Sequence, residues 1–118
     1  MAIKEIDVTQ LYNLIEEGGK LNILDVRSPE EFEHEHAQNA KLFTLEHISP
    51  EAISKLNIDK DQPIYFICRS GRRSYVAAEM FVSEGYNLLY NIEGGTMDWV
   101  SKGYPVCTGI KEQENLLD

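Results

Sequence analysis

The stretch that decides the fold is Pro63-Ile64-Tyr65-Phe66-Ile67-Cys68-Arg69-Ser70-Gly71-Arg72-Arg73-Ser74. Residues 63–67 are apolar on both faces and rich in β-branched and aromatic side chains, as in a strand buried within a parallel sheet. A polar loop that contains a glycine follows at 68–73. Residues 74–84 then carry apolar side chains at helical spacing and stop at Gly85. A buried strand, a tight loop and a helix in this order predict one unit of an α/β sheet.

The segments on either side continue this alternation. Two helix starts have the spacing of a capping box, Asp7 with Gln10 and Ser28 with Glu31, and a proline follows the second cap. We expect the second of these helices, over 29–34, to be short. The other predicted elements are strands over 21–26, 41–45 and 88–91 and helices over 50–56 and 95–102. Together they predict an α/β fold with a mostly parallel central sheet that is flanked by helices on both faces.

Length, charge and cysteine content narrow the function classes. A chain of 118 residues predicts one domain, which we place at 1–107, followed by a polar tail at 108–118 that we expect to fray. The net charge of −9 argues against nucleic acid and anionic membrane surfaces as partners. No apolar run is long enough to span a bilayer, and only two cysteines are present. These features favour a cytoplasmic protein that is a monomer or a weak dimer.

Cys68 lies where three activating features meet. It follows the buried strand, at the sheet edge where α/β proteins place their ligands. The loop leads into the start of a helix, whose free N–H groups attract anions, and Gly71 allows the backbone to curl around one. Arg69, Arg72 and Arg73 add positive charge. Such surroundings lower a cysteine pKa from about 8.5 into the range of about 3.5–7.5. The sequence therefore predicts that Cys68 is a nucleophilic thiolate.

The loop composition indicates which electrophile such a thiolate attacks. No acidic residue within the loop is available to protonate a leaving group. Thiosulfate needs none, because its leaving group, sulfite, is a stable anion. Attack by Cys68 on the outer sulfur would leave a persulfide, which cyanide, a thiol or the cysteine of another protein could then discharge. This two-step chemistry predicts a small anionic sulfur donor, a thiophilic acceptor, and neither a metal nor an organic cofactor.

At these residues the chain resembles the rhodanese family of sulfurtransferases, over about Ile6 to Val106. Three motifs carry the resemblance, in the family order. They are Leu24-Asp25-Val26-Arg27-Ser28-Pro29-Glu30-Glu31-Phe32, then Cys68-Arg69-Ser70-Gly71-Arg72-Arg73-Ser74, and then Ile92-Glu93-Gly94-Gly95-Thr96-Met97-Asp98-Trp99 with Gly103-Tyr104-Pro105-Val106. The resemblance implies the rhodanese fold, with thiosulfate or a protein persulfide as sulfur donor.

The resemblance also implies roles within the active-site loop. Cys68 takes the place of the nucleophile, and residues 69–74 take the place of the substrate-binding loop: Arg69, Ser70, Gly71, Arg72, Arg73 and Ser74. Arg73 matches the family's loop arginine, and we expect its side chain to brace the loop through backbone carbonyls. Arg69 and Arg72 are expected to face solvent and attract a dianionic donor.

The chain departs from the family pattern beside the first motif. It has Glu35-His36-Ala37 where Gly-His-Ile is frequent, and Asn39-Ala40 where Gly-Ala is frequent. A proline that is usual near Thr44 is absent. These differences affect the rim next to the first motif and leave the nucleophile and its loop unchanged.

Other chemically capable residues are interpreted as supporting or structural. Asp25 and Arg27 are expected to bond the loop backbone or each other at a strand end. Cys107 lacks an activating neighbourhood and is predicted to be inert. Met97 and Trp99 are expected in the core. The histidines at 34, 36 and 47 lack the spacing of metal ligands, and the acids at 30, 31, 33 and 35 form a solvated helix face or, less favoured, a docking surface for a basic partner.

Other functions are compatible with the same elements. Cysteine-based phosphatases and arsenate reductases on this fold have five residues between cysteine and arginine, whereas four separate Cys68 from Arg73. The shorter loop suits a persulfide sulfur better than a tetrahedral oxyanion. A persulfide relay between proteins uses the same chemistry as a rhodanese. A non-catalytic interaction module is the remaining alternative, although such domains often lack the cysteine.

Overall fold

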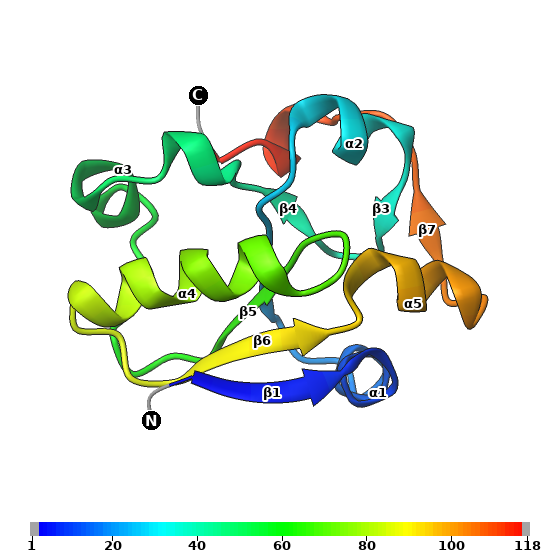
Figure 1. Ribbon diagram of the computed structural model, residues 1–118, viewed down its shortest axis with the longest axis horizontal. Helices are drawn as coiled ribbons and strands as arrows, with labels where there is room; N and C mark the ends of the chain where they lie inside the picture. The colour runs from blue at the N-terminus through cyan, green and yellow to red at the C-terminus, as the bar shows by residue number, and fades with distance from the viewer. Residues whose placement is uncertain (1–2, 117–118) are drawn as a thin grey trace.

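The computed structural model describes residues 3–116, which are built around a five-stranded sheet (Figure 1). In spatial order its strands are β1 (Ile3–Asp7), β6 (Leu89–Glu93), β5 (Ile64–Ile67), β2 (Asn22–Asp25) and β4 (Lys41–Leu42). Every neighbouring pair is parallel. The strand that ends at Cys68 is therefore the central one, with two strands on either side.

Helices cover both faces of the sheet, as the sequence predicts. One face carries α3 (Pro50–Ser54) and α4 (Arg72–Ser83), and the other carries α1 (Val8–Glu16), α2 (Pro29–His34) and α5 (Gly95–Ser101). Alternate strand residues supply the two cores, because successive side chains point to opposite faces. Phe66 packs in the core beneath α4, whereas Tyr65 and Ile67 pack in the core on the α1 side. The α/β fold class is confirmed.

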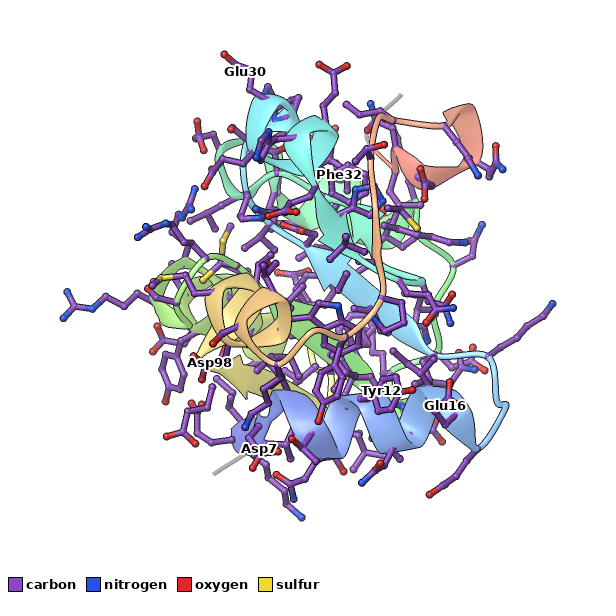
Figure 2. The ribbon with its side chains drawn as sticks, turned by 90° about the vertical axis from the view of Figure 1, so that its right-hand side faces the viewer. Asp7, Tyr12, Glu16, Glu30, Phe32 and Asp98 are labelled. Atoms are coloured by element: carbon purple, nitrogen blue, oxygen red, sulfur yellow. The ribbon has the colours of Figure 1, made fainter. Side chains whose placement is uncertain are left out.

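Both predicted capping boxes are present. The Asp7 carboxylate accepts a hydrogen bond from the Gln10 amide at 2.8 Å, and the Gln10 side chain accepts one from the Asp7 amide at 2.9 Å. Ser28 and Glu31 make the same reciprocal pair at the start of α2. Figure 2 shows the two faces of α2: Phe32 lies beneath the helix in the interior, whereas Glu30 points to solvent. These local signals predict helix starts well because each cap satisfies free N–H groups of its own first turn.

The structure adds elements that the sequence does not predict. β1 forms one edge of the sheet although Lys4, Glu5 and Asp7 make its sequence strongly polar. Two short strands, β3 (His36–Ala37) and β7 (Val106–Cys107), pair antiparallel beside the main sheet. Short 3₁₀ turns, η1 (Leu45–His47) and η2 (Glu112–Glu114), complete the architecture. α4 begins at Arg72, two residues earlier than the apolar pattern predicts.

The C-terminal segment does not fray within the part that the structure describes. The amide of Gly109 donates to the Glu33 carbonyl at 2.7 Å, and the amide of Leu116 donates to the Leu42 carbonyl at 2.9 Å. Leu116 also packs against the core on the α4 face. The prediction of a frayed tail is therefore wrong for residues 108–116, because apolar side chains in a polar stretch dock onto the domain. Among residues 3–116, no helix has the length and apolar character needed to cross a membrane.

Candidate functional site

The Cys68 thiol lies under a loop that donates hydrogen bonds to it. Cys68 directly follows β5 and is only 1% exposed. Its Sγ atom accepts a hydrogen bond from the backbone N–H of Gly71 at 3.1 Å and from the Ser74 hydroxyl at 3.2 Å. Both donors come from the turn that begins α4. The predicted strand, loop and helix therefore bring donors to the sulfur, where they stabilise negative charge.

The pKa of the Cys68 thiol is set by two opposing effects. Burial raises the pKa, because a thiolate is poorly solvated in the interior. Hydrogen bonds from the Ser74 hydroxyl and from the amides of Ser74, Gly71 and Ser70 lower it, and they prevail, so the pKa lies below the ordinary thiol value. The sequence attributes part of this lowering to arginine charge. In the structure the main causes are hydrogen bonds instead.

Two glycines make the loop geometry possible. Gly71 has a φ of 106°, in the left-handed region that side chains rarely adopt, and this turns its N–H toward the sulfur. Gly95, at the start of α5, lies so close to the loop that a Cβ atom would clash with the carbonyl oxygens of Cys68 and Arg69. Thr96 then donates its amide to the Cys68 carbonyl at 2.8 Å. The glycine pair of the third motif therefore lets α5 hold the loop from behind.

Arg73 is held by an acid of α2. Its two terminal nitrogens donate to the two carboxylate oxygens of Glu31, each at 2.8 Å. The hydrogen bond from Arg73 is the main cause that lowers the Glu31 pKa to about 2. The same pair raises the Arg73 pKa. Arg73 thus braces the loop through a carboxylate rather than through backbone carbonyls as predicted, and Glu31 is more than part of a solvated face.

The sequence does not predict a chain of polar side chains behind the loop, in which Ser74 and Asn91 are buried and Glu5 is exposed. The Ser74 hydroxyl lies 2.5 Å from Oδ1 of Asn91, on β6, as well as next to the sulfur. The Asn91 amide nitrogen donates to the Gly71 carbonyl at 3.0 Å and to the Glu5 carboxylate of β1 at 3.0 and 3.1 Å. Because the Ser74 hydroxyl has a single hydrogen, Cys68 and Asn91 compete for it. The sequence signal for this chain is a buried asparagine among apolar strand residues.

Asp25 and Arg27 bond each other, as expected for supporting residues. Asp25 is fully buried and Arg27 is 5% exposed. Arg27 donates from Nε to the Asp25 carboxylate at 2.9 Å and from a terminal nitrogen to the same group at 2.8 Å. A further hydrogen bond runs from Arg27 to the carbonyl of Glu35 at 2.9 Å. The pair therefore ties the end of β2 to the end of α2.

The exposed loop residues face two different hollows. Arg69 and Arg27 line a cleft of about 610 Å³ between α2 and α5. Ser70, Gly71 and Arg72 line a second hollow of about 380 Å³ on the β1 side. Arg69 and Arg72 are both exposed, as predicted. Residues of the loop around the buried sulfur thus line both hollows.

The three histidines and the two side chains expected in the core, Met97 and Trp99, differ in burial. His34 and His47 are exposed, whereas His36 is buried, with Nδ1 2.8 Å from the Phe32 carbonyl and Nε2 3.3 Å from Glu114. Among the described residues, no group of three or more His, Cys, Asp or Glu side chains is placed to hold a metal ion. Trp99 is buried, but Met97 is 49% exposed, so its assignment to the core is wrong.

Comparison with known proteins identifies the family. The model of the rhodanese-like domain matches residues 7–102. The chain belongs to the rhodanese-like domain family. This confirms the resemblance seen in the three motifs, all of which lie within or close to the matched range. The observed sheet and helices are accordingly a rhodanese-like fold.

Individual relatives agree with this assignment. The chain is 31% identical over 104 residues to a sulfurtransferase from Allochromatium vinosum, covering 88% of this chain and 94% of the relative. It is 35% identical over 101 residues to a putative sulfur carrier protein from Bacillus subtilis, covering 86% of this chain but only 53% of the relative's length. The crystal structure of a rhodanese-related protein from Thermoplasma volcanium is 30% identical, with a TM-score of 0.70, covering 88% of this chain and 97% of the other.

Proposed function

We propose that this rhodanese-like domain is a sulfurtransferase that carries sulfur as a persulfide on Cys68. The observation that carries the proposal is the pair of hydrogen bonds from the Gly71 amide and the Ser74 hydroxyl to Sγ. These donors favour the thiolate, which is the nucleophilic form of cysteine. The names of similar proteins, a sulfurtransferase and a putative sulfur carrier protein, support the same class of chemistry.

In the first step the Cys68 thiolate attacks the outer sulfur of thiosulfate. A bond forms between Sγ and that sulfur, and the sulfur–sulfur bond of thiosulfate breaks. Sulfite leaves with the bonding electron pair, and Cys68 becomes the persulfide anion. No proton is transferred, so the site needs no general acid for this donor. Another persulfide could donate sulfur in the same way, with a thiolate as the leaving group.

In the second step a thiophilic acceptor attacks the outer sulfur of the Cys68 persulfide. The acceptor–sulfur bond forms, the Sγ–sulfur bond breaks, and the electron pair returns to Sγ as the thiolate. Cyanide would become thiocyanate, and a thiolate would become a persulfide. The donors that stabilise the starting thiolate also stabilise Cys68 as the leaving group. The same amides and hydroxyl therefore assist both halves of the cycle.

The loop length supports sulfur transfer over phosphate chemistry. Four residues separate Cys68 from Arg73, and two of the donors within this tight turn bond Sγ itself. Arg73 is occupied by Glu31 at 2.8 Å, rather than being free to grip oxygens of a tetrahedral anion. Both thiols are free, which fits a reducing, cytoplasmic setting. We therefore place phosphatase and arsenate reductase activity behind sulfur transfer.

Mass spectrometry after exposure to thiosulfate tests the proposal. We expect the intact protein to gain the mass of one sulfur atom, mapped by peptide analysis to Cys68, and to lose it on treatment with cyanide. Hydrolysis of an aryl phosphate, assayed on the same sample, should be negligible. Absence of the added sulfur with thiosulfate and with a small persulfide donor, or efficient phosphate hydrolysis, would contradict the assignment.

A further inference from the structure

The 610 Å³ cleft beside the active-site loop has two chemically different walls. α2 contributes Glu30, Glu31, His34 and Glu35, and α5 contributes Thr96, Met97 and Val100. Arg27 and Arg69 complete the lining. Thr96 links the cleft to the backbone of Cys68, because its amide and its hydroxyl both donate to the Cys68 carbonyl, at 2.8 and 3.1 Å. The cleft therefore borders the Cys68 loop, with Arg69, the residue that follows Cys68, in its lining.

Several charges of the cleft are already neutralised within the protein. Glu31 pairs with Arg73, and Arg27 pairs with Asp25. Glu30 and Glu35 make no ion pair within residues 3–116, and neither does Arg69. The charges that remain available to a binding partner are thus two carboxylates on α2, Glu30 and Glu35, and the guanidinium of Arg69, which follows Cys68 in the chain. A partner that complements them is cationic along α2 and anionic at the sulfur.

The opposite wall offers an apolar contact. Met97 is 49% exposed and Val100 is 39% exposed, and their spacing of three residues places them on the same side of α5. Two large apolar side chains exposed in the same cleft as Arg69 differ from apolar residues scattered singly over a surface. Covering them with a partner side chain removes apolar surface from water, which stabilises a complex.

We infer that this cleft docks a segment of the sulfur-accepting protein in which the acceptor cysteine is flanked by lysine or arginine and by a large apolar side chain. The inference rests on the proposed sulfur transfer. The cleft volume lies in the range of about 300–1,000 Å³ that holds ligands of drug or peptide size, far larger than thiosulfate or cyanide. The basic side chain pairs with Glu30 and Glu35, and the apolar one covers Met97 and Val100.

The chemistry of the transfer fits this placement. In the persulfide, the reacting atom is the outer sulfur, which is bonded to Sγ at about 2.0 Å. The acceptor cysteine loses its proton to solvent, and Arg69 favours the resulting thiolate. That thiolate attacks the outer sulfur, the sulfur–sulfur bond breaks, and Cys68 leaves as a thiolate. Docking therefore aligns two cysteines without an additional acid or base.

Transfer to short peptides tests the inference. Cys68 is loaded with thiosulfate and then mixed with capped peptides of sequence Gly-Xaa-Cys-Leu-Xaa, in which Xaa is lysine, glutamine or glutamate. We expect the second-order rate to be about tenfold higher for the lysine peptide than for the glutamate peptide, with a ratio that shrinks as salt screens the charges. Peptide thiols differ in pKa, so the decisive comparison is between protein variants with each peptide.

The double variant Glu30→Lys/Glu35→Lys should reverse the peptide order. Its matched control is Glu16→Lys/Glu17→Lys, which changes the net charge equally; both control residues are exposed, and Figure 2 shows Glu16 on α1 at the opposite end of the molecule from Glu30. The control should keep the wild-type order. Loading by dianionic thiosulfate should become faster in the α2 variant, opposite in sign to the loss with the lysine peptide.

A separate pair of variants tests the apolar contact with α5. Met97→Ser should lower the rate with the leucine-containing lysine peptide several-fold and leave a peptide with glycine in place of leucine unaffected. Val82→Ser removes a comparably exposed side chain, 40% accessible, from α4 and should change neither rate.

The outcomes separate this inference from the proposed function. Suppose that Cys68 accepts sulfur normally, but the α2 double variant and its α1 control both keep the wild-type order of rates among the peptides. Docking in the cleft is then refuted, while sulfur transfer stands. Equal rates for the lysine peptide and for a small anionic thiol, in every variant, would likewise refute it in favour of a small-molecule acceptor. If Cys68 cannot be loaded at all, the proposed function fails and the inference fails with it.

Discussion

Cys68 and Cys107 are the same side chain in two very different settings. Cys68 is 1% exposed at the end of the central strand, and two donors meet its sulfur at 3.1 and 3.2 Å. Cys107 is half-buried on β7, a two-residue strand that pairs with His36 and Ala37. Burial by itself raises a thiol pKa, so the more buried cysteine would be the less reactive one without its loop. The hydrogen-bond donors, which act against burial, are therefore what lowers the Cys68 pKa.

The loop around Cys68 is in turn supported by distant parts of the chain. α2 holds it through Glu31, α5 through Thr96, and β6 through Asn91. The segment around Cys107 contributes instead to packing, through the strand pair and the Glu114 contact to His36. Removing supports should therefore reduce reactivity at Cys68 in proportion to how closely each support contacts the sulfur.

Replacing each cysteine is the strongest test of this comparison. Cys68→Ser should lower thiocyanate formation from thiosulfate and cyanide by at least about a thousandfold, because the nucleophile is lost. Cys107→Ser should retain nearly the wild-type rate. Circular dichroism and thermal unfolding check that both variants fold. Substantial turnover by folded Cys68→Ser, or its loss in Cys107→Ser, would reverse the roles of the two thiols.

Replacing the arginines one at a time distinguishes support of the loop by Arg73 from attraction of thiosulfate by Arg69 and Arg72. Arg73→Ala leaves Glu31 without its partner and loosens the loop, so we expect kcat for thiosulfate turnover to fall about tenfold to a hundredfold. Arg69→Ala and Arg72→Ala remove exposed charges, and we expect a higher KM for thiosulfate with weaker salt dependence and little change in kcat. Steady-state kinetics at several salt concentrations distinguish the two patterns. The opposite assignment, with kcat falling only in Arg69→Ala, would be evidence against the brace.

The Ser74 hydroxyl should have a smaller and pH-dependent effect. Ser74→Ala removes a hydrogen bond that lowers the Cys68 pKa, so the rise of alkylation rate with pH should move to higher pH. At neutral pH the alkylation rate should fall several-fold, because less thiolate is present. Iodoacetamide modification in a Cys107→Ser background reports on Cys68 alone. An unshifted profile would mean that the Ser74 proton stays with Asn91 throughout.

The smallest expected effect is that of replacing Glu31, and it concerns the free energy of unfolding. The hydrogen bond from Arg73 lowers the Glu31 pKa from the ordinary 4.5 to about 2, so the stabilising contribution of this pair is complete above about pH 5 and is lost as the pH falls toward 2. Glu31→Gln should cost about 1 kcal/mol of unfolding free energy at pH 7, because both partners are partly solvated. Urea unfolding should show this difference closing by about pH 2. Glu33→Gln, which replaces an exposed acid on the same helix, serves as the control.

Local sequence determined much of this protein. The run at 63–67 predicts the central strand because its residues must be buried on both faces. Ser28 and Asp7 predict helix starts because their caps act within one turn. Asp25 and Arg27 are two residues apart, so their pairing is also a short-range event. The family motifs, the fold class and the position of Cys68 within them could all be read in this way.

Contacts between segments far apart in the chain decided the rest. Lys4 and Glu5 are polar and do not predict a strand, and β1 forms there because it pairs with β6. The need for glycine at position 95 becomes clear only when α5 is seen to lie against the Cys68 loop. Arg73 finds Glu31 across 42 residues, and Asn91 finds Glu5 across 86. Pairings of this kind depend on which elements become neighbours in the fold. The periodicity and spacing of residues along the chain do not predict them. The proposed nucleophile, Cys68, could therefore be predicted from the sequence, whereas the hydrogen bonds that support its loop are seen only in the folded structure.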